Sequence, residues 1–66
     1  KRYQVEFNRL EVGTRFSKNG NGWVKRSTRT AEILTEPGKG KWFYFGKDEP
    51  CTVNESVAKG QGFVSA

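Results

Sequence analysis

The sequence predicts an all-β fold, a small five-stranded antiparallel barrel of the SH3-like class, with the OB-like class as second choice. Apolar and polar residues alternate in several short runs, and Gly, Asn and Pro clusters separate these runs at intervals of about 8–12 residues. The chain has 66 residues, which is room for one domain only. Closure into a barrel removes the exposed edges that a flat sheet would leave. We therefore expect residues 1–66 to form a single small β-barrel domain.

The first half of the chain predicts three or four strands. Alternation predicts a strand over residues 2–7 and a second over residues 12–16. Asn and Gly in residues 18–22 tolerate positive φ, so a hairpin turn follows there. Residues 23–27 and 29–35 are rich in β-branched and aromatic residues, and they form either a hairpin or one long bent strand.

The second half predicts two further strands and little helix. Residues 36–40 form a turn around Pro37, and a strand covers residues 41–45. A turn over residues 46–50 precedes a short last strand at 51–53, an edge strand because Pro50 lacks an N–H. We expect residues 54–66 to form a weakly structured tail or a short helical turn, with Asn54 as its cap.

Strand parity predicts which side chains enter the core. Eleven apolar residues can point inward in a consistent alternation: Val5, Phe7, Leu10, Val12, Phe16, Val24, Ala31, Ile33, Phe43, Phe45 and Val53. Trp23, Trp42 and Tyr44 then lie on the other face. There they form either a second small core under the tail or a binding platform.

The composition argues against catalysis and against metal binding. The chain has no His, which removes the commonest general base and the commonest zinc ligand. Its one cysteine, Cys51, forms no intrachain disulfide, and we expect it to be a small buried hydrophobe in a reducing, cytoplasmic setting. No apolar run approaches the length of a membrane span. We therefore expect no enzymatic activity, no cofactor, no metal and no membrane partner.

The placement of charge favours an anionic partner. The net charge is +5, and residues 12–31 hold five basic residues and no acidic one. Basic residues beside aromatic residues are typical of surfaces that bind RNA or single-stranded DNA. The predicted nucleic-acid-binding residues are Arg15, Lys18, Trp23, Lys25, Arg26, Arg29, Lys39, Lys41, Trp42 and Tyr44.

Other interpretations of the same surface stay open. Arg26 and Arg29 fall on the nominal core side with Val24 and Ala31, so a bend near residues 27–28 is needed to bring them out. The cations can also be merely solubilising, with the two Trp residues packed together. The chain can instead be a protein-interaction module that docks on an acidic protein surface, or a homo-oligomer whose aromatic face is the subunit interface.

Three runs carry a resemblance to known proteins. Residues 10–16 contain "Leu-x-Val-Gly-x-x-Phe", residues 22–31 contain "Val-Lys-x-Ser-x-x-Thr-Ala", and residues 41–46 contain "Trp-Phe-Tyr-Phe-Gly". In this the chain resembles small bacteriophage-encoded proteins, a resemblance that implies no established activity but places the protein in a bacterial host cell and suggests a modulator of a host protein. The Val12-Gly13 opening is also similar to that of SH3-like barrels of the KOW and Tudor kind, which implies binding of nucleic acid or protein tails.

Overall fold

A computed structural model describes residues 1–65 as one antiparallel sheet with short helical segments at two places. The elements in chain order are β1 (Arg2–Glu6), the 3-10 helix η1 (Phe7–Arg9), β2 (Arg15–Lys18), β3 (Asn21–Lys25), β4 (Thr30–Ile33), β5 (Trp42–Tyr44), β6 (Pro50–Asn54) and α1 (Glu55–Gly60). The all-β prediction is confirmed.

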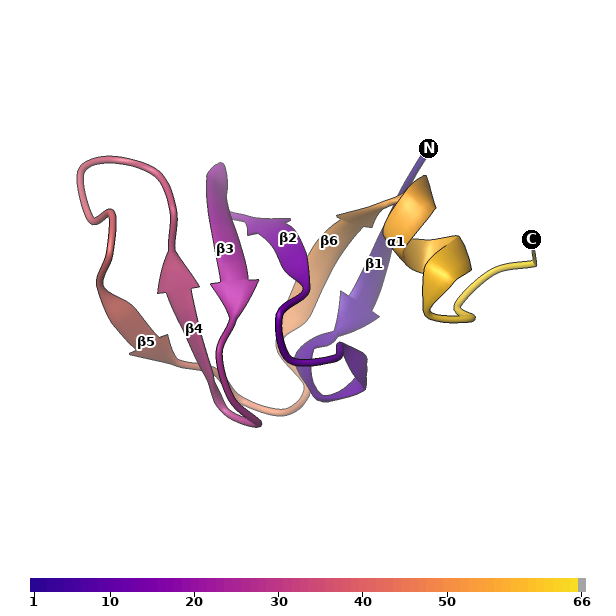
Figure 1. Ribbon diagram of the computed structural model, residues 1–66, viewed down its shortest axis with the longest axis horizontal. Helices are drawn as coiled ribbons and strands as arrows, with labels where there is room; N and C mark the ends of the chain where they lie inside the picture. Colours follow the sequence, from indigo (N-terminus) through magenta and orange to yellow (C-terminus); the bar gives the residue numbers. More distant parts are fainter. Residues whose placement is uncertain (66) are drawn as a thin grey trace.

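The predicted five-stranded closed barrel is wrong in strand number and in closure. The sheet has six strands in the order β1-β6-β2-β3-β4-β5, so β1 and β5 are its two edges (Figure 1). The extra strand arises because residues 23–35 form a hairpin: the N–H of Arg26 donates to the carbonyl of Thr30 at 2.9 Å. The long bent strand is therefore excluded. β6 and β2 share a single paired position, Ser17 with Thr52.

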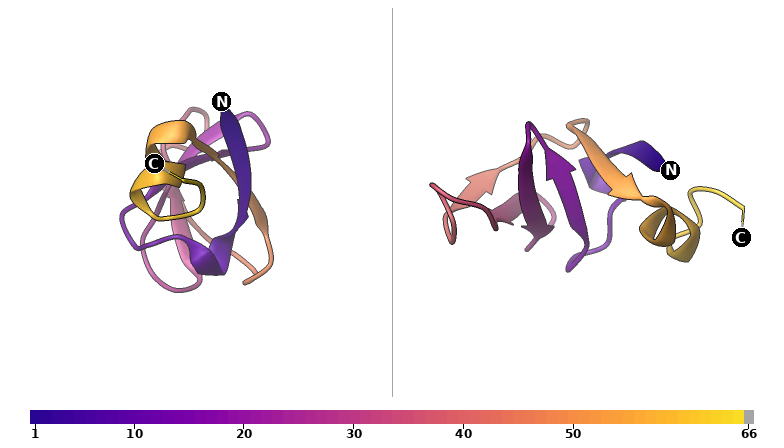
Figure 2. Two further views of the ribbon diagram at one scale, coloured as in Figure 1. Left: turned by 90° about the vertical axis from the view of Figure 1, so that its right-hand side faces the viewer. Right: turned by 90° about the horizontal axis from the view of Figure 1, so that it is seen from above.

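The sheet curves strongly around that weak junction. β1 and β6 lie at one end of the molecule with α1, and β3, β4 and β5 lie at the other, with β2 between them (Figure 1). Seen along the long axis, the strands wrap around a common centre (Figure 2). The molecule measures 35 × 21 × 17 Å along its principal axes. It is thus an open, twisted sheet whose inner face holds the core.

The predicted β2–β3 hairpin turn is confirmed. Asn19 and Gly20 have φ of 53° and 77°, the left-handed conformation that both central residues of a tight hairpin turn adopt. The two-residue turn places Lys18 opposite Asn21 and Phe16 opposite Trp23. This register decides which residues of β3 enter the core.

The core is a cluster of stacked and edge-on aromatic rings. Phe7 stacks on Phe45 with ring centroids 4.6 Å apart, and Phe16 meets both rings edge-on. Trp23 lies edge-on to Phe45 at 5.0 Å. Such pairs add about 0.5–1.5 kcal/mol each to the free energy gained by burying the rings. A few large rings therefore give this small, polar chain a core.

The predicted faces of Trp23 and Val24 are wrong, and two predicted core residues, Val12 and Phe43, are exposed. Trp23 is buried, at 8% exposure, because it lies opposite Phe16 on the inner face; Val24 is buried as well but lies outside the core cluster. Val12 is 63% exposed because β2 begins only at Arg15. Phe43 points to the inner side but is 46% exposed, since β5 is an edge strand. The other predicted core residues are buried.

The carboxyl-terminal segment covers one end of the core. The Asn54 side chain accepts a hydrogen bond from the N–H of Val57 at 2.9 Å, so its predicted capping role is confirmed. Ala58 is fully buried, and Phe63 and Val64 pack against the core. No helix among residues 1–65 is long and apolar enough to cross a membrane.

Candidate nucleic-acid interface

The structure divides the ten predicted site residues between the two faces of the sheet. We call the face opposite the core cluster the outer face. Arg15, Arg26, Trp42 and Tyr44 lie on it by strand register, whereas Trp23 and Lys25 lie on the inner face. The remaining members lie near the ends of strands: Lys18, Arg29, Lys39 and Lys41.

Lys25 is a buried structural residue and leaves the predicted surface. It is 3% exposed, and its Nζ donates to the carbonyl oxygens of Phe7 at 2.8 Å and Leu10 at 2.6 Å. The ammonium also lies 4.5 Å from the centroid of the Phe7 ring. Desolvation by burial lowers the pKa of Lys25 from its ordinary value. Its charge holds η1 against β3 and is not presented to a ligand.

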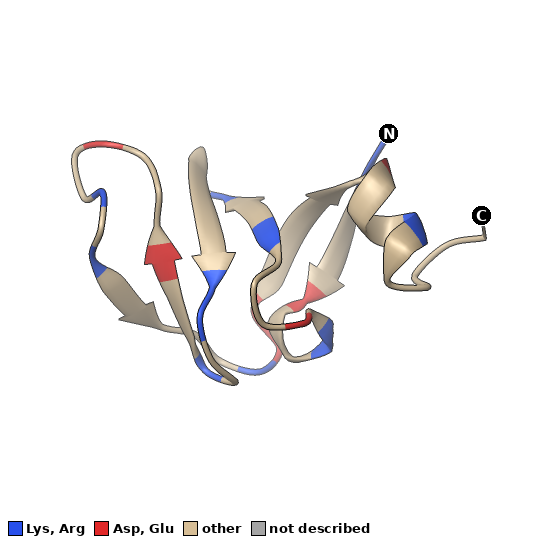
Figure 3. Cartoon of the chain, viewed as in Figure 1, with Lys and Arg blue, Asp and Glu red and all other residues tan. Residues whose placement is uncertain are grey.

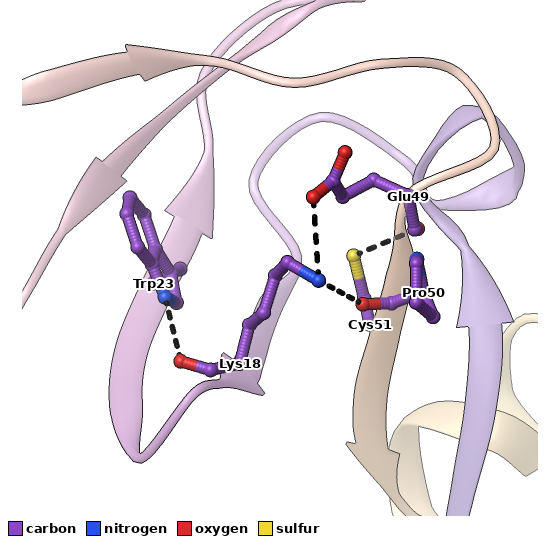
Figure 4. A network of polar contacts seen from close by, with 5 residues as sticks. All are labelled: Lys18, Trp23, Glu49, Pro50 and Cys51. Atoms are coloured by element: carbon purple, nitrogen blue, oxygen red, sulfur yellow. Dashed lines mark hydrogen bonds and ion pairs between the residues drawn. The ribbon is translucent and has the colours of Figure 1, made fainter.

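Lys18 is also held by the protein. Its Nζ lies 3.4 Å from a carboxylate oxygen of Glu49 and donates to the Pro50 carbonyl at 3.1 Å (Figure 4). The side chain is 16% exposed. The Lys18 carbonyl accepts a hydrogen bond from Nε1 of Trp23 at 3.3 Å, so one residue ties β2 to both β3 and β6. Its contribution to a ligand surface is therefore small.

Cys51 lies beside this network and is chemically quiet. It is fully buried, and its Sγ lies 3.5 Å from the carbonyl oxygen of Glu49 (Figure 4). Burial raises the pKa of the Cys51 thiol to about 11. A thiol that stays protonated at neutral pH is a poor nucleophile and a poor metal ligand. The predicted role as a small buried hydrophobe fits this position.

Two exposed aromatic side chains share the outer face of β5. Trp42 is 59% exposed and Tyr44 is 76% exposed, and they are two residues apart on one strand. Phe43, between them, points the other way and meets Trp23 edge-on at 5.4 Å. The predicted exposed platform thus exists with two of its three members.

Arg26 lies next to this platform and is partly neutralised. Its Nε and Nη2 lie 2.8 and 2.6 Å from one carboxylate oxygen of Glu32. Its guanidinium carbon is 6.0 Å from the centroid of the Trp42 ring. The prediction placed Arg26 on the core side together with Val24, so a bend was needed to expose it. The observed register of β3 puts Val24 itself on the outer face, and Arg26, two residues later, lies there without a bend. The arginine side chain remains 41% exposed.

The other cations are less concentrated in space than in sequence. Lys39 and Lys41 are exposed in and after the loop that leads into β5, and Arg29 is half-buried in the β3–β4 turn. Figure 3 shows basic residues along the whole length of the molecule. The local excess of positive charge near β5 therefore comes from Lys39 and Lys41, together with Arg26 and Arg29.

Sequence reasoning missed one basic residue on the outer face. Six residues, one from each strand, form a row across the outer face: Arg2, Asn54, Arg15, Val24, Glu32 and Trp42. Each neighbouring pair in this row is a paired position of the sheet, except Asn54 and Arg15. Arg2 on β1 and Arg15 on β2 lie on either side of Asn54 of β6, and both line one hollow. No local signal identifies Arg2, since its position depends on the pairing of the first strand with the last.

Among residues 1–65 no group of three or more Cys, Asp or Glu side chains is arranged to hold a metal ion.

The chain shows no significant match to any family model, to any curated protein or to any solved structure.

Proposed function

We propose that this chain is a non-enzymatic module that binds single-stranded nucleic acid, RNA or DNA, on the outer face of β4 and β5. The observation that carries the proposal is the pair of exposed rings, Trp42 and Tyr44, on one face of an edge strand, with the Arg26 guanidinium near the Trp42 ring. Stacking of a base on an aromatic side chain contributes about 1–3 kcal/mol and tolerates any sequence.

The spacing of the two rings favours a single strand over a duplex. Residues two apart on a strand are about 6.6 Å apart along its axis. Successive bases in a duplex are separated by about 3.4 Å. Two rings at twice that spacing fit bases that are pulled apart, as bound single strands present them. Trp42 and Tyr44 are therefore proposed to receive two splayed bases.

The surrounding charge supports the same ligand. Lys39 and Lys41 form no ion pair among the described residues, and both are exposed. Ammonium groups just before β5 attract backbone phosphates at long range, and hydroxyl groups such as that of Thr30 make short contacts. Glu32 is the one acidic residue in the outer-face row, and Arg26 neutralises it.

The test is a binding titration with a mixed-sequence single-stranded ten-nucleotide oligomer. We expect the logarithm of the affinity to fall with the logarithm of salt concentration, by about 0.7 per neutralised phosphate. Trp42→Ala or Tyr44→Ala is expected to weaken binding by about 5- to 150-fold each, the equivalent of one lost stacking interaction.

Val12→Ala is the matched control, because Val12 is an exposed apolar residue outside the interface. Its affinity is expected to equal that of the unmodified chain. Absence of measurable binding at low salt, or equal affinities for the Trp42→Ala and Val12→Ala variants, would contradict the proposed function.

The free edge of β5 favours a second candidate, a protein-interaction module of the kind a bacteriophage uses on a host protein. Hydrogen bonds from Ile33 N–H to the Lys41 carbonyl at 2.9 Å, and from Phe45 N–H to the Arg29 carbonyl at 2.7 Å, flank the paired residue Phe43. In an antiparallel ladder the backbone groups of Trp42 and Tyr44 then point away from β4. An extended acidic segment, or a second copy of the chain, can pair there.

Two measurements separate this candidate from the first. A protein ligand leaves the oligonucleotide titration without a signal, whatever the salt concentration. Self-association through β5 produces a dimer in sedimentation experiments at high micromolar concentration, and Tyr44→Pro abolishes it by removing an edge N–H.

We also propose that the fold is an open relative of SH3-like small barrels. The β2–β3–β4 meander with tight hairpins and the strong curvature support this assignment. A solved structure that superposes β2 to β5 on an SH3-like barrel in the same order tests it.

A further inference from the structure

We propose that the outer face carries a phosphate-binding site at the junction of β6 and β2, held by the guanidinium groups of Arg2 and Arg15. The site is a hollow of about 290 Å³, which we call the junction hollow. It forms because β6 and β2 pair only at Ser17 and Thr52 and then diverge. A second hollow of about 330 Å³ continues from it toward the β2–β3 turn and shares Arg2, Ser17 and Thr52.

The lining of the junction hollow is suited to an anion. Two arginines come from different strands, and Ser17 and Thr52, in the neighbouring row of the same face, contribute hydroxyl groups to the lining. Guanidinium groups bind phosphate with two parallel hydrogen bonds, and hydroxyl groups donate to the remaining oxygens. Neither hollow is lined by a carboxylate. The neighbouring hollow that also borders Arg15 is lined by Glu11, which makes it the poorer anion site.

These donors are not used by the protein itself. Within the described part of the chain, Arg2 and Arg15 form no ion pair, although four ion pairs occur elsewhere. The side chains of Arg2, Arg15, Ser17 and Thr52 take part in none of the hydrogen bonds that involve side chains among residues 1–65. By contrast, the side chains of Lys18 and Lys25 both donate hydrogen bonds to carbonyl groups of the protein. The two arginines are thus free to bind a ligand.

The position of the hollow connects it to the aromatic platform. Arg15 and Trp42 lie on the same row of the outer face, three strands apart, which is about 14 Å along the sheet at the usual strand spacing. A single strand covers that distance with two to four nucleotides, depending on how far it is stretched beyond about 3.4 Å per step. Binding of a nucleic-acid strand in the hollow rests on the proposed function. Binding of a phosphate group there can be tested with a small anion alone.

The first experiment titrates the full chain with inorganic phosphate and follows backbone amide signals by NMR. We expect shifts confined to the residues that border the hollow: Arg2, residues 15–17, residues 22–23, Leu34 and residues 52–54. The variant Arg2→Gln/Arg15→Gln is expected to weaken phosphate binding at least tenfold. Lys47→Gln/Lys59→Gln, which removes the same charge from two exposed positions outside the hollow, is expected to keep it. Shifts spread over all basic segments, or equal losses in the two variants, would overturn the proposal.

The second experiment identifies the source of the phosphate group. It compares a ten-nucleotide strand with and without a 5′-phosphate on the unmodified chain and on Arg2→Gln/Arg15→Gln. A backbone phosphate predicts that the arginine variant weakens both strands equally and lowers the salt slope by about 0.7–1.4. A terminal phosphate predicts that only the phosphorylated strand is weakened.

The phosphate proposal and the proposed function fail in different ways. Phosphate shifts at the junction hollow without any oligonucleotide binding would retain the site and assign it to a small phosphorylated compound. Oligonucleotide binding that depends on Trp42 and ignores both arginines would retain the proposed function and overturn the phosphate site.

Discussion

Trp23 and Trp42 lie on opposite faces of one curved sheet, and their surroundings show how the protein divides its aromatic and basic residues. Trp23 is packed between other aromatic rings, with its N–H bonded to the Lys18 carbonyl. Trp42 is 59% exposed, and a guanidinium is its near neighbour. On the inner face the rings stabilise the fold and the cation Lys25 is bound by carbonyl oxygens. On the outer face Trp42 and Tyr44 are exposed, and we propose that they bind a ligand.

The largest difference is expected from truncating each tryptophan. Trp23→Ala removes a core ring and is expected to lower the free energy of unfolding by about 3–5 kcal/mol. Trp42→Ala is expected to change it by no more than about 0.5 kcal/mol, because an exposed side chain loses little packing. Urea denaturation followed by circular dichroism measures both. Similar losses for the two variants would show that Trp42 contributes to the stability of the fold as much as Trp23 does.

The next prediction concerns Lys25, the basic residue buried on the inner face. Lys25→Met keeps the apolar stem and removes the donor to the Phe7 and Leu10 carbonyls. We expect the free energy of unfolding to fall by about 1–3 kcal/mol, since the buried Leu10 carbonyl loses its partner. Oligonucleotide affinity at 5 °C, where the variant remains folded, is expected to be unchanged. A gain in stability would mean that desolvation of the ammonium outweighs its hydrogen bonds.

Cys51 predicts a smaller effect that appears at alkaline pH. Its pKa of about 11 in the folded protein exceeds its ordinary value of 9.0, so the unfolded chain loses the thiol proton first as pH rises. The stabilisation from this shift is complete below about pH 9 and declines toward pH 11. We expect the stability gap between the unmodified chain and Cys51→Ala to shrink by about 1 kcal/mol between pH 8 and pH 10. A gap that stays constant would place the thiol in contact with water.

The dependence of stability on pH that Lys25 causes has the opposite sign to the one that Cys51 causes. Its lowered pKa makes the folded chain release that proton first, so its own contribution to stability rises with pH up to 10.5. Both chains in the comparison carry Lys25, and its contribution cancels except for the part that arises from its interaction with the Cys51 thiolate.

The smallest change in stability is expected from Glu32→Gln. The pair with Arg26 is partly exposed, and such pairs contribute about 0–1 kcal/mol. Loss of the carboxylate frees Arg26 for a phosphate, so oligonucleotide affinity at low salt should rise and the salt slope should grow by about 0.7. A weaker affinity in Glu32→Gln would show that the carboxylate orients Arg26 for binding.

Strand positions could be predicted because they depend on local chemistry. Alternating side chains, the Asn19-Gly20 turn and the Asn54 cap each act over a few residues; the turn and the cap appear as predicted, and each predicted strand overlaps an observed one, although β2 begins three residues later than predicted. The face of β3 failed because Trp23 and Val24 are adjacent and both apolar, so alternation alone fits either assignment. The turn held the missing information: a two-residue loop at Asn19-Gly20 sets Trp23 opposite Phe16.

The features that could not be predicted depend on pairing between distant parts of the chain. Lys25 is buried because η1 brings the Phe7 and Leu10 carbonyls to it, and Arg2 lines the same hollow as Arg15 because β1 and β2 flank the same strand, β6. The sheet stays open for the same reason: β5 ends as a free edge rather than meeting β1. Charge clustering in residues 12–31 predicted an interface, but strand alternation divides those cations between two faces and the turns.

The most direct test of this division observes the indole N–H signals of Trp23 and Trp42 in one NMR spectrum, assigned with Trp42→Phe. The Trp23 signal is expected to exchange slowly with deuterium because its N–H is hydrogen-bonded and its side chain is buried, and the Trp42 signal is expected to exchange at once. When a single-stranded ten-nucleotide oligomer is added, we predict that the Trp42 signal shifts and the Trp23 signal stays in place. A shift of Trp23 alone, or no shift of Trp42 at saturating oligonucleotide, would contradict the division of the two faces into core and binding surface.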